Sequence, residues 1–345
     1  MSTKVYSKPL SAGDTACIVD PSSPLIEKRV KASQQFLSNL GLATSIGSNL
    51  AKESLLYDNI LSGKAKLSDQ SAYSNNGYTA GTPADRANEI LTADTDAIFC
   101  LPGGYGAVQT LPYLCTNDNL QKLASQAPVI SGFSDVTPIL NVIYQRTGLV
   151  TYHAPMVTPN FVESSMIKDG KYNQYTYSYW HKFLFTDWHD VELHNPSGHA
   201  MHTLRSGKAA GDIVGGNLQE LSWLTGTPYQ LDLHDKILFI EDVDVTIPML
   251  DMALAHMYQA GVFDGVKGVI IGDFVDCLNE GAGERGDFAS LDARQIIEER
   301  ILQYTPNVPV LSGLAIGHNA DTVTIPIGAY CELDAGTQII RIIRK

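Results

Sequence analysis

The sequence lacks several features that would point to particular classes of protein. Its five cysteines are scattered and form no C-x-x-C pair, which is typical of reduced cysteines in a cytoplasmic protein. No apolar run is long enough to cross a bilayer, and no signal-peptide core follows the first lysines. With 24 Lys and Arg against 37 Asp and Glu, the formal net charge is −13. This balance argues against nucleic acid or an anionic membrane as a partner.

Signatures of cofactor and metal sites are missing as well. Gly103-Gly104-Tyr105-Gly106 lacks the P-loop lysine and does not fit G-x-G-x-x-G, so neither a phosphate loop nor a dinucleotide site is expected. Four histidines crowd one segment: His189, His194, His199 and His202. Their spacing matches no common zinc pattern and H-E-x-x-H is absent, so we expect surface histidines, no metal and no cofactor. A metal-dependent hydrolase that uses this segment is kept as an alternative.

The order of the predicted elements indicates an α/β protein. Buried strands alternate with helices over short loops, which is typical of a parallel sheet of βαβ units. We predict an N-terminal α/β domain with a Rossmann-like sheet at residues 1–157 and a C-terminal mixed α/β domain at 208–345. Residues 158–207 are rich in Tyr, Trp, His and Asn with weak periodicity, and we interpret them as a linker or lid.

The most informative stretch runs from Pro128 to Leu140. An apolar run ends in Gly132, Ser134 follows, and apolar residues then recur with a helical period. A strand, a tight turn and a helix would hold the Ser134 hydroxyl at a helix N-terminus, as in a nucleophile elbow, although Val136 replaces the last glycine of G-x-S-x-G. The alternative is that Ser134 or Asp135 simply caps the helix.

A serine nucleophile needs a base and an acceptor that orients the base. His318 lies between Gly317 and Asn319, just before a predicted strand, and is the best-placed histidine. Glu241 ends an apolar strand, where a charged group is costly unless it is paired. By position alone, Asp242 and Asp244 are rivals for the same role, and a structural histidine in a loop is the alternative for His318.

The glycine turn at residues 103–106 follows a predicted strand, as Ser134 does. The carboxyl ends of parallel strands meet at one edge of a sheet, so the turn and Ser134 are expected at the same edge. Backbone N–H groups of the turn, with the amide after the nucleophile, would suit an oxyanion hole. The alternative is an ordinary glycine turn.

Taken in order, these stretches resemble the LD-carboxypeptidase family of serine peptidases, which also contains the microcin-immunity peptidases. The resembling stretches extend from the first strand to the last: Gly13-Asp14, Pro21-Ser22-Ser23-Pro24, Gly103-Gly104-Tyr105-Gly106, Gly132-Phe133-Ser134-Asp135-Val136-Thr137, His153-Ala154-Pro155, Gly215-Gly216-Asn217-Leu218, Ile240-Glu241-Asp242-Val243, Gly317-His318 and Pro326-Ile327-Gly328.

The resemblance implies a Ser-His-Glu triad in the cleft between the two domains. Ser134 would be the nucleophile, His318 the base and acid, and Glu241 the acceptor that orients His318. The backbone amides of Gly104 and Asp135 would form the oxyanion hole. The resemblance further implies a cytoplasmic, homodimeric hydrolase in peptidoglycan recycling, which releases D-alanine from the murein tetrapeptide by cutting an L,D bond.

Departures from the family pattern leave the substrate open. Pro102 stands where the family usually has an arginine, and no Lys or Arg lies beside the glycine turn or the elbow, so we expect backbone amides or a lid residue to hold the substrate carboxylate. An acidic insertion at 276–287 is expected to reshape the cleft rim. Trp180 or Trp188 would stack on a nucleotide, as in the immunity branch, or pack as core. A peptidyl-nucleotide substrate and a non-catalytic muropeptide-binding module remain alternatives.

Overall fold

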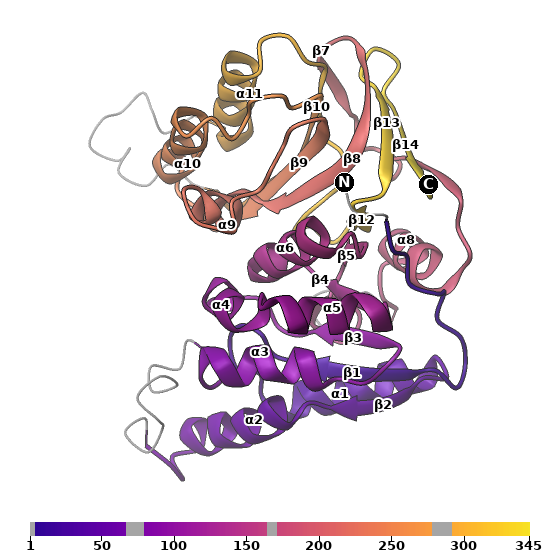
Figure 1. The fold of residues 1–345 in the computed structure, drawn as a ribbon, viewed down its shortest axis with the longest axis vertical. Helices are drawn as coiled ribbons and strands as arrows, with labels where there is room; N and C mark the ends of the chain where they lie inside the picture. Colours follow the sequence, from indigo (N-terminus) through magenta and orange to yellow (C-terminus); the bar gives the residue numbers. More distant parts are fainter. Residues whose placement is uncertain (1–3, 67–78, 164–170, 278–291) are drawn as a thin grey trace. The chain divides into compact units, whose positions relative to one another are not determined.

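The computed structural model describes residues 4–66, 79–163, 171–277 and 292–345 (Figure 1). Contacts divide the chain into two compact units, Met1–Asp187 and Trp188–Lys345. The division falls inside the range 158–207 that the sequence indicated as a linker, so the described part of that range is shared between the units. Most of the acidic insertion, from residue 278 on, and residues 164–170 of the predicted linker lie outside the described residues.

The first unit is built on a parallel sheet with the strand order β2-β1-β3-β4-β5. The strands are β1 (Thr15–Val19), β2 (Ala43–Ile46), β3 (Ala97–Cys100), β4 (Val129–Gly132) and β5 (Thr151–His153). The helices are α1 (Glu27–Asn39), α2 (Ser48–Leu61), α3 (Pro83–Thr92), α4 (Leu111–Leu114), α5 (Asn117–Gln126), α6 (Thr137–Thr147), α7 (Val157–Asn160) and α8 (Gln174–Phe185), with 3₁₀ turns η2 (Ala107–Thr110) and η3 (Ser134–Val136). Strand and helix alternate as the sequence predicted.

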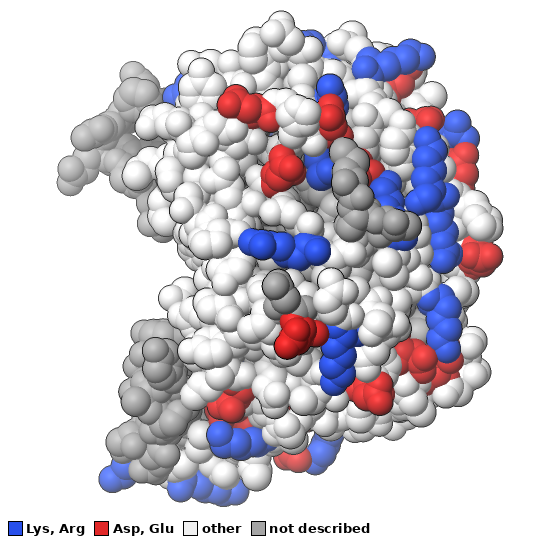
Figure 2. Space-filling view, in the orientation of Figure 1, with Lys and Arg blue, Asp and Glu red and all other residues white. Residues whose placement is uncertain are grey.

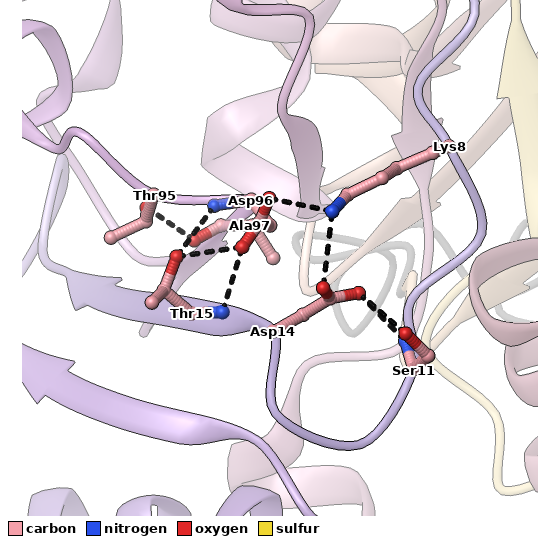
Figure 3. Close-up of polar contacts among 7 residues, drawn as sticks. All are labelled: Lys8, Ser11, Asp14, Thr15, Thr95, Asp96 and Ala97. Atoms are coloured by element: carbon pink, nitrogen blue, oxygen red, sulfur yellow. Dashed lines mark hydrogen bonds and ion pairs between the residues drawn. The ribbon is translucent and has the colours of Figure 1, made fainter.

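The amino ends of β1 and β3 are joined by a polar cluster at the edge of the sheet away from the glycine turn (Figure 3). Asp96 accepts hydrogen bonds from the backbone N–H and the hydroxyl of Thr15, each at 2.8 Å. The Nζ of Lys8 bridges Asp96 at 3.0 Å and Asp14 at 3.1 Å. The hydrogen bonds from Thr15 and Lys8 lower the pKa of Asp96 to about 2. This cluster fastens the chain before β1 to the sheet.

Helix α8 belongs to the first unit and carries an aromatic core. Its buried residues are Thr176, Trp180, Phe183 and Leu184, spaced i, i+4, i+7 and i+8. Trp180 is fully buried, and its ring centroid lies 5.1 Å from that of Phe161. The segment therefore has a helical period after all, which the three tyrosines and the histidine at other positions of the helix conceal.

The second unit contains an eight-stranded mixed sheet with the order β6-β14-β13-β8-β9-β10-β11-β7. Its strands are β6 (Asp190–Leu193), β7 (His202–Arg205), β8 (Lys208–Asn217), β9 (Lys236–Val243), β10 (Gly268–Val275), β11 (Val310–Ser312), β13 (Tyr330–Asp334) and β14 (Ile339–Ile343), and β12 (Ile325–Ile327) contacts β8. Strands β8 to β11 are parallel, and the flanking strands pair antiparallel. The helices are α9 (Leu218–Leu224), α10 (Ile247–Gln259) and α11 (Ala293–Tyr304).

The predicted fold class is confirmed: a parallel α/β unit is followed by a mixed α/β unit. Within the described ranges, no helix is both long and apolar enough to span a membrane. Acidic and basic side chains are interspersed on the face that Figure 2 shows. Each unit has parallel strands with a carboxyl edge, where functional loops of such sheets gather.

Candidate active site

Ser134 occupies a strained position directly after β4. Its φ is 59°, a left-handed value that few non-glycine residues adopt. A Cβ built on Gly103 would lie 3.0 Å from the Ser134 Oγ, so the elbow and the glycine turn are side by side and a side chain at residue 103 would crowd the serine hydroxyl. Ser134 is the first residue of η3 and not its N-cap; the N-cap residues of η3 and α6 are Phe133 and Val136, and neither makes a side-chain capping hydrogen bond. Strain at a half-buried serine favours a functional role over a cap.

Asp135 holds the glycine turn against the elbow. Its carboxylate is buried and accepts hydrogen bonds from the backbone N–H of Gly106 at 3.2 Å and of Ala107 at 2.8 Å. From the sequence, Asp135 was expected to act through its backbone amide or to cap the following helix. The structure adds a side-chain role, because this carboxylate fixes the turn that follows β3 relative to the serine that follows β4.

The glycine turn is also supported from the side of β1. Gly104 has a φ of 114°, and a Cβ there would lie 2.3 Å from the Ser23 hydroxyl oxygen, so another residue would clash. The same hydroxyl accepts a hydrogen bond from the Tyr105 N–H at 3.1 Å. No described group accepts a hydrogen bond from the Gly104 N–H. Gly104 is exposed and follows Gly103, whose backbone lies beside the Ser134 hydroxyl, so this N–H suits the oxyanion-hole role that the resemblance implied.

Arg86 lies behind the turn, although no basic residue is near it in the sequence. The guanidinium is fully buried and donates to the carbonyl oxygens of Ser22 and Gly106 and to the Gln109 Oε1, at 3.0 to 3.4 Å. Burial lowers its pKa, and the negative charge of Asp135 opposes that shift. Through these hydrogen bonds Arg86 connects the loop after β1 to the glycine turn after β3, and because it is buried it presents no exposed face to a substrate.

A buried acidic pair lies at the carboxyl end of β1. Glu89 accepts hydrogen bonds from the backbone N–H groups of Asp20 at 3.0 Å and Leu50 at 2.8 Å. The side chain of Asn49 donates to the Asp20 Oδ1 at 2.9 Å. Burial, and next the charge of Glu89, raise the pKa of Asp20 well above its usual range. Burial raises the pKa of Glu89 as well, and the hydrogen-bonded pair anchors the start of the loop that carries Ser23.

In the second unit, Glu241 and His318 are hydrogen-bonded. The His318 Nδ1 lies 2.7 Å from the Glu241 Oε2, and Glu241 is completely buried near the end of β9. Because the carboxylate can only accept, we assign the proton to Nδ1, which leaves Nε2 as the basic atom. Burial lowers the pKa of His318, but the charge and hydrogen bond of Glu241 outweigh it and raise the pKa overall.

Gly317 makes the close approach of Glu241 and His318 possible. Its φ is 122°, and a Cβ at this position would lie 2.6 Å from the Glu241 Oε2. The Gly317 N–H donates to the Thr322 hydroxyl at 3.0 Å, which closes the loop. A side chain at residue 317 would therefore push on the carboxylate that contacts His318.

The rival carboxylate of Asp242 has other partners. Asp242 accepts from the Asn217 side chain at 2.7 Å and from the backbone N–H groups of Val243 and Gln219 at 2.8 and 2.9 Å. Burial, and next the charge of Glu241, raise the pKa of Asp242 to about 7. Asp242 thus orders the start of α9, and the backbone of Asp244 donates to the Val275 carbonyl. The hydrogen bond to His318 singles out Glu241 among the three acids.

Two domain models of one protein family match the chain in sequence order. The model of the LD-carboxypeptidase N-terminal domain matches residues 17–154, and that of the C-terminal domain matches residues 210–333. The chain belongs to the LD-carboxypeptidase family. It is therefore an enzyme of the serine peptidase class, as the resemblance of its motifs predicted.

Relatives in this family carry two kinds of name. A probable murein peptide carboxypeptidase from Bacillus subtilis is 28% identical over 95% of this chain and 91% of its own length. The microcin C7 self-immunity protein MccF from Escherichia coli is 25% identical over 98% of this chain and 95% of its own length. The LD-carboxypeptidase family thus includes full-length relatives of this chain with both descriptions.

Solved structures show the same fold. An MccF-like protein from Bacillus anthracis has a TM-score of 0.76 at 23% identity, with 99% of this chain and 100% of that chain covered. MccF in complex with aspartyl sulfamoyl adenosine has a TM-score of 0.74 at 22% identity, covering 99% of each chain. At these identities the likeness establishes the two-part LD-carboxypeptidase fold and not the substrate.

The two tryptophans and the histidine-rich segment named in the sequence analysis are not part of the groups around Ser134 or His318. Trp180 is enclosed in the aromatic core of the first unit, and Trp188 is 2% exposed, so the described packing of both favours the core alternative. Within the part of the chain that the structure describes, no three His, Cys, Asp or Glu side chains are arranged to hold a metal ion. Of the histidine-rich segment, His199 and His202 line a cavity of the second unit.

Proposed function

We propose that this chain is a serine carboxypeptidase that hydrolyses an L,D-peptide bond and releases terminal D-alanine from the peptidoglycan tetrapeptide. Ser134 is the nucleophile, His318 the general base and acid, and Glu241 the residue that orients His318. The single observation that carries the proposal is the 2.7 Å contact between the His318 Nδ1 and the buried Glu241 Oε2. A histidine held in this way has its Nε2 directed to a reacting hydroxyl in serine peptidases.

The proposed reaction has two steps. His318 Nε2 takes the Ser134 hydroxyl proton as Oγ attacks the carbonyl carbon of the L-residue, and the oxyanion is stabilised by the N–H groups of Gly104 and Asp135. The C–N bond then breaks, and His318 returns the proton to the amine of the leaving D-alanine. Water, deprotonated by His318, hydrolyses the acyl-serine and restores the enzyme. Throughout, the Glu241 carboxylate stabilises the imidazolium.

The proposal extends to the setting of the enzyme. A tetrapeptide with a free C-terminus arises when murein is recycled or assembled, so we propose a cytoplasmic enzyme that acts on small muropeptides. We also propose that it forms a homodimer, which sedimentation velocity would test. The substrate carboxylate is proposed to be held by backbone amides, since Arg86, the basic residue that the fold brings to the glycine turn, donates to carbonyl oxygens.

One alternative substrate has specific support. MccF, to which this chain is 25% identical, is a microcin C7 self-immunity protein, and its solved complex contains aspartyl sulfamoyl adenosine. A peptidyl-nucleotide would use the same nucleophile and base, because only the leaving group differs. This alternative requires an exposed aromatic side chain on which the nucleobase can stack, and the burial of Trp180 and Trp188 disfavours it.

Mass spectrometry of matched reactions tests the proposal. Murein tetrapeptide should lose one D-alanine, an all-L tetrapeptide should remain intact, and an aminoacyl sulfamoyl adenosine should remain intact. Ser134→Ala should abolish the loss, while Ser125→Ala, an exposed serine on α5, should have no effect. Cleavage of the nucleotide conjugate alone would favour the immunity-type function. Loss of activity with a chelator and its survival in Ser134→Ala would favour a metal-dependent hydrolase, and binding without turnover would favour a binding module.

A further inference from the structure

A buried cation and a buried anion of the first unit bind the same peptide group of the glycine turn. The Arg86 Nη2 donates to the carbonyl oxygen of Gly106 at 3.2 Å. The N–H of that peptide group, which belongs to Ala107, donates to the Asp135 Oδ2 at 2.8 Å. Both side chains are shielded from solvent, since Arg86 is 0% and Asp135 1% exposed. One peptide group therefore joins the two buried charges through its two polar ends.

This arrangement fixes the orientation of the turn. Hydrogen bonds to charged groups are stronger than those between neutral groups, and this peptide group makes one at each end. If it rotated by half a turn, its carbonyl would meet the Asp135 carboxylate and its N–H the Arg86 guanidinium, and both contacts would be repulsive. Gly106 has a φ of 113°, and a Cβ there would lie 2.8 Å from the Arg86 Nη1, so the glycine leaves the space that the guanidinium occupies.

Arg86 also connects the turn to the loop after β1. Its Nη1 donates to the Ser22 carbonyl at 3.4 Å. The next residue, Ser23, accepts a hydrogen bond from the Tyr105 N–H at 3.1 Å. Gly104, the proposed oxyanion donor, directly precedes Tyr105. The position of the Gly104 amide therefore depends on two loops that Arg86 holds together.

The charge of Arg86 matters for the reaction as well as for the turn. Asp135 supplies one of the two N–H groups proposed for the oxyanion hole, and both oxygens of its carboxylate accept backbone hydrogen bonds, as expected for the ionised form. Like charges repel strongly in a buried site, so this carboxylate alone would oppose a developing oxyanion. Burial lowers the pKa of Arg86, and the charge of Asp135 is the largest effect that opposes this shift, so the two groups interact electrostatically.

We propose that Arg86 is a positioning residue for the oxyanion hole, which fixes the glycine turn together with Asp135 and offsets the negative charge of Asp135 as the oxyanion forms. The inference rests on the proposed function, since it assigns part of the oxyanion stabilisation to a residue that touches no substrate. It also explains how a turn preceded by Pro102, with no basic residue beside it in the sequence, can serve an anionic transition state.

Steady-state kinetics of Arg86 variants on the murein tetrapeptide test the inference. Arg86→Met removes the charge and should lower kcat about a hundredfold while KM stays within about twofold of the wild type, as expected for a loss of oxyanion stabilisation. Arg86→Lys should recover part of kcat, to about tenfold below the wild type, because the charge returns without the planar fork. Arg29→Met is the matched control, since Arg29 lies in the same unit and pairs with Glu163 through an exposed side chain; its kinetics should not change.

A double variant separates the charge of Arg86 from its support of the fold. Arg86→Met leaves Asp135 buried without its cation, whereas Arg86→Met/Asp135→Asn removes both charges. If Arg86 acts on the oxyanion through Asp135, the double variant should be no slower than Arg86→Met. A loss equal to the product of the two single losses overturns the inference, as does a rise in KM alone. If Arg86→Met does not fold, Arg86→Lys replaces it, and a wild-type kcat in that variant overturns the inference.

Labelling by a fluorophosphonate makes the test independent of the substrate. The Ser134 Oγ attacks phosphorus, its proton passes to the general base, fluoride leaves, and negative charge develops on the phosphoryl oxygen as it does in acylation. The rate of labelling at Ser134, followed by mass spectrometry, should fall about a hundredfold in Arg86→Met and stay unchanged in Arg29→Met. If the wild type is labelled but leaves the tetrapeptide intact, the proposed substrate fails and a slower labelling of Arg86→Met still supports the inference. Equal labelling rates overturn the inference even where the tetrapeptide is cleaved.

Discussion

Replacing Glu241 by glutamine should separate activity from stability, because it removes a buried charge that the reaction needs and the fold does not. Glutamine is nearly isosteric with glutamate, so the 2.7 Å contact to His318 can be kept in geometry while the negative charge is lost. With charge centres about 4 Å apart and an effective dielectric constant of about 20, the carboxylate stabilises imidazolium by about 4 kcal/mol. We therefore expect kcat to fall about 10³- to 10⁴-fold in Glu241→Gln.

The same variant should be at least as stable as the wild type. Glu241 is completely buried, and its Oε1 has no hydrogen-bond partner among the described residues. Removing a buried, incompletely satisfied carboxylate commonly leaves the free energy of unfolding unchanged or raises it by about 1 kcal/mol. The raised pKa of His318 stabilises the wild-type fold below the ordinary histidine pKa, and that stabilisation is lost as pH rises through the folded value. The gain in Tm should therefore be larger at pH 8 than at pH 5.

Steady-state kinetics on the murein tetrapeptide and thermal unfolding measured at both pH values provide the two readouts. The acid limb of the pH dependence of kcat/KM should move to lower pH in Glu241→Gln, because the charge that raises the pKa of His318 is gone. Asp242→Asn is the matched control, since Asp242 is the adjacent buried acid and its partners are Asn217, Gln219 and Val243. A larger loss of kcat in Asp242→Asn than in Glu241→Gln would refute the assignment.

Three other carboxylates give independent expectations. Asp135→Asn should lower kcat about ten- to a hundredfold with the fold retained, because an amide cannot accept from both N–H groups of the glycine turn; unchanged kinetics would contradict this role. Asp20→Asn should raise Tm at pH 8 more than at pH 5. Burial and the charge of Glu89 raise the pKa of Asp20 in the folded protein, so as pH rises above the pKa of an ordinary aspartate the Asp20 carboxyl increasingly destabilises the wild-type fold, and asparagine removes this penalty. Asp96→Asn should lower the free energy of unfolding by about 1 kcal/mol at pH 6, because Thr15 and Lys8 lose the carboxylate that they bind. The pKa of Asp96 is lowered to about 2, so the stabilisation by its carboxylate is lost as pH falls from 4 to 2. Urea titrations of the variant and the wild type should therefore converge over that range.

The local sequence pattern was sufficient to predict most helices and strands and to select the candidate site residues. Helices such as α10 (Ile247–Gln259) follow from apolar spacing and from proline at the first turn. The order of strands and helices was sufficient for the parallel sheet of the first unit. Ser134, Glu241 and His318 were recognisable because each follows or precedes a buried strand, and because the motifs around them occur in family order. Helix α8 was missed, although its apolar spacing was visible, because aromatic and polar residues mask it.

Contacts between residues far apart in the chain were decided by the tertiary structure. Glu241 and His318 are 77 positions apart, and local pattern could not choose between Glu241, Asp242 and Asp244, since three acids at one strand end differ only in where the pleat and turn direct them. In the same way, Asp135 and Arg86 reach the glycine turn only because parallel strands bring separate loops to one edge. Spacing along a sequence carries periodicity within an element, whereas hydrogen bonds between loops depend on strand order and register, which long-range packing sets.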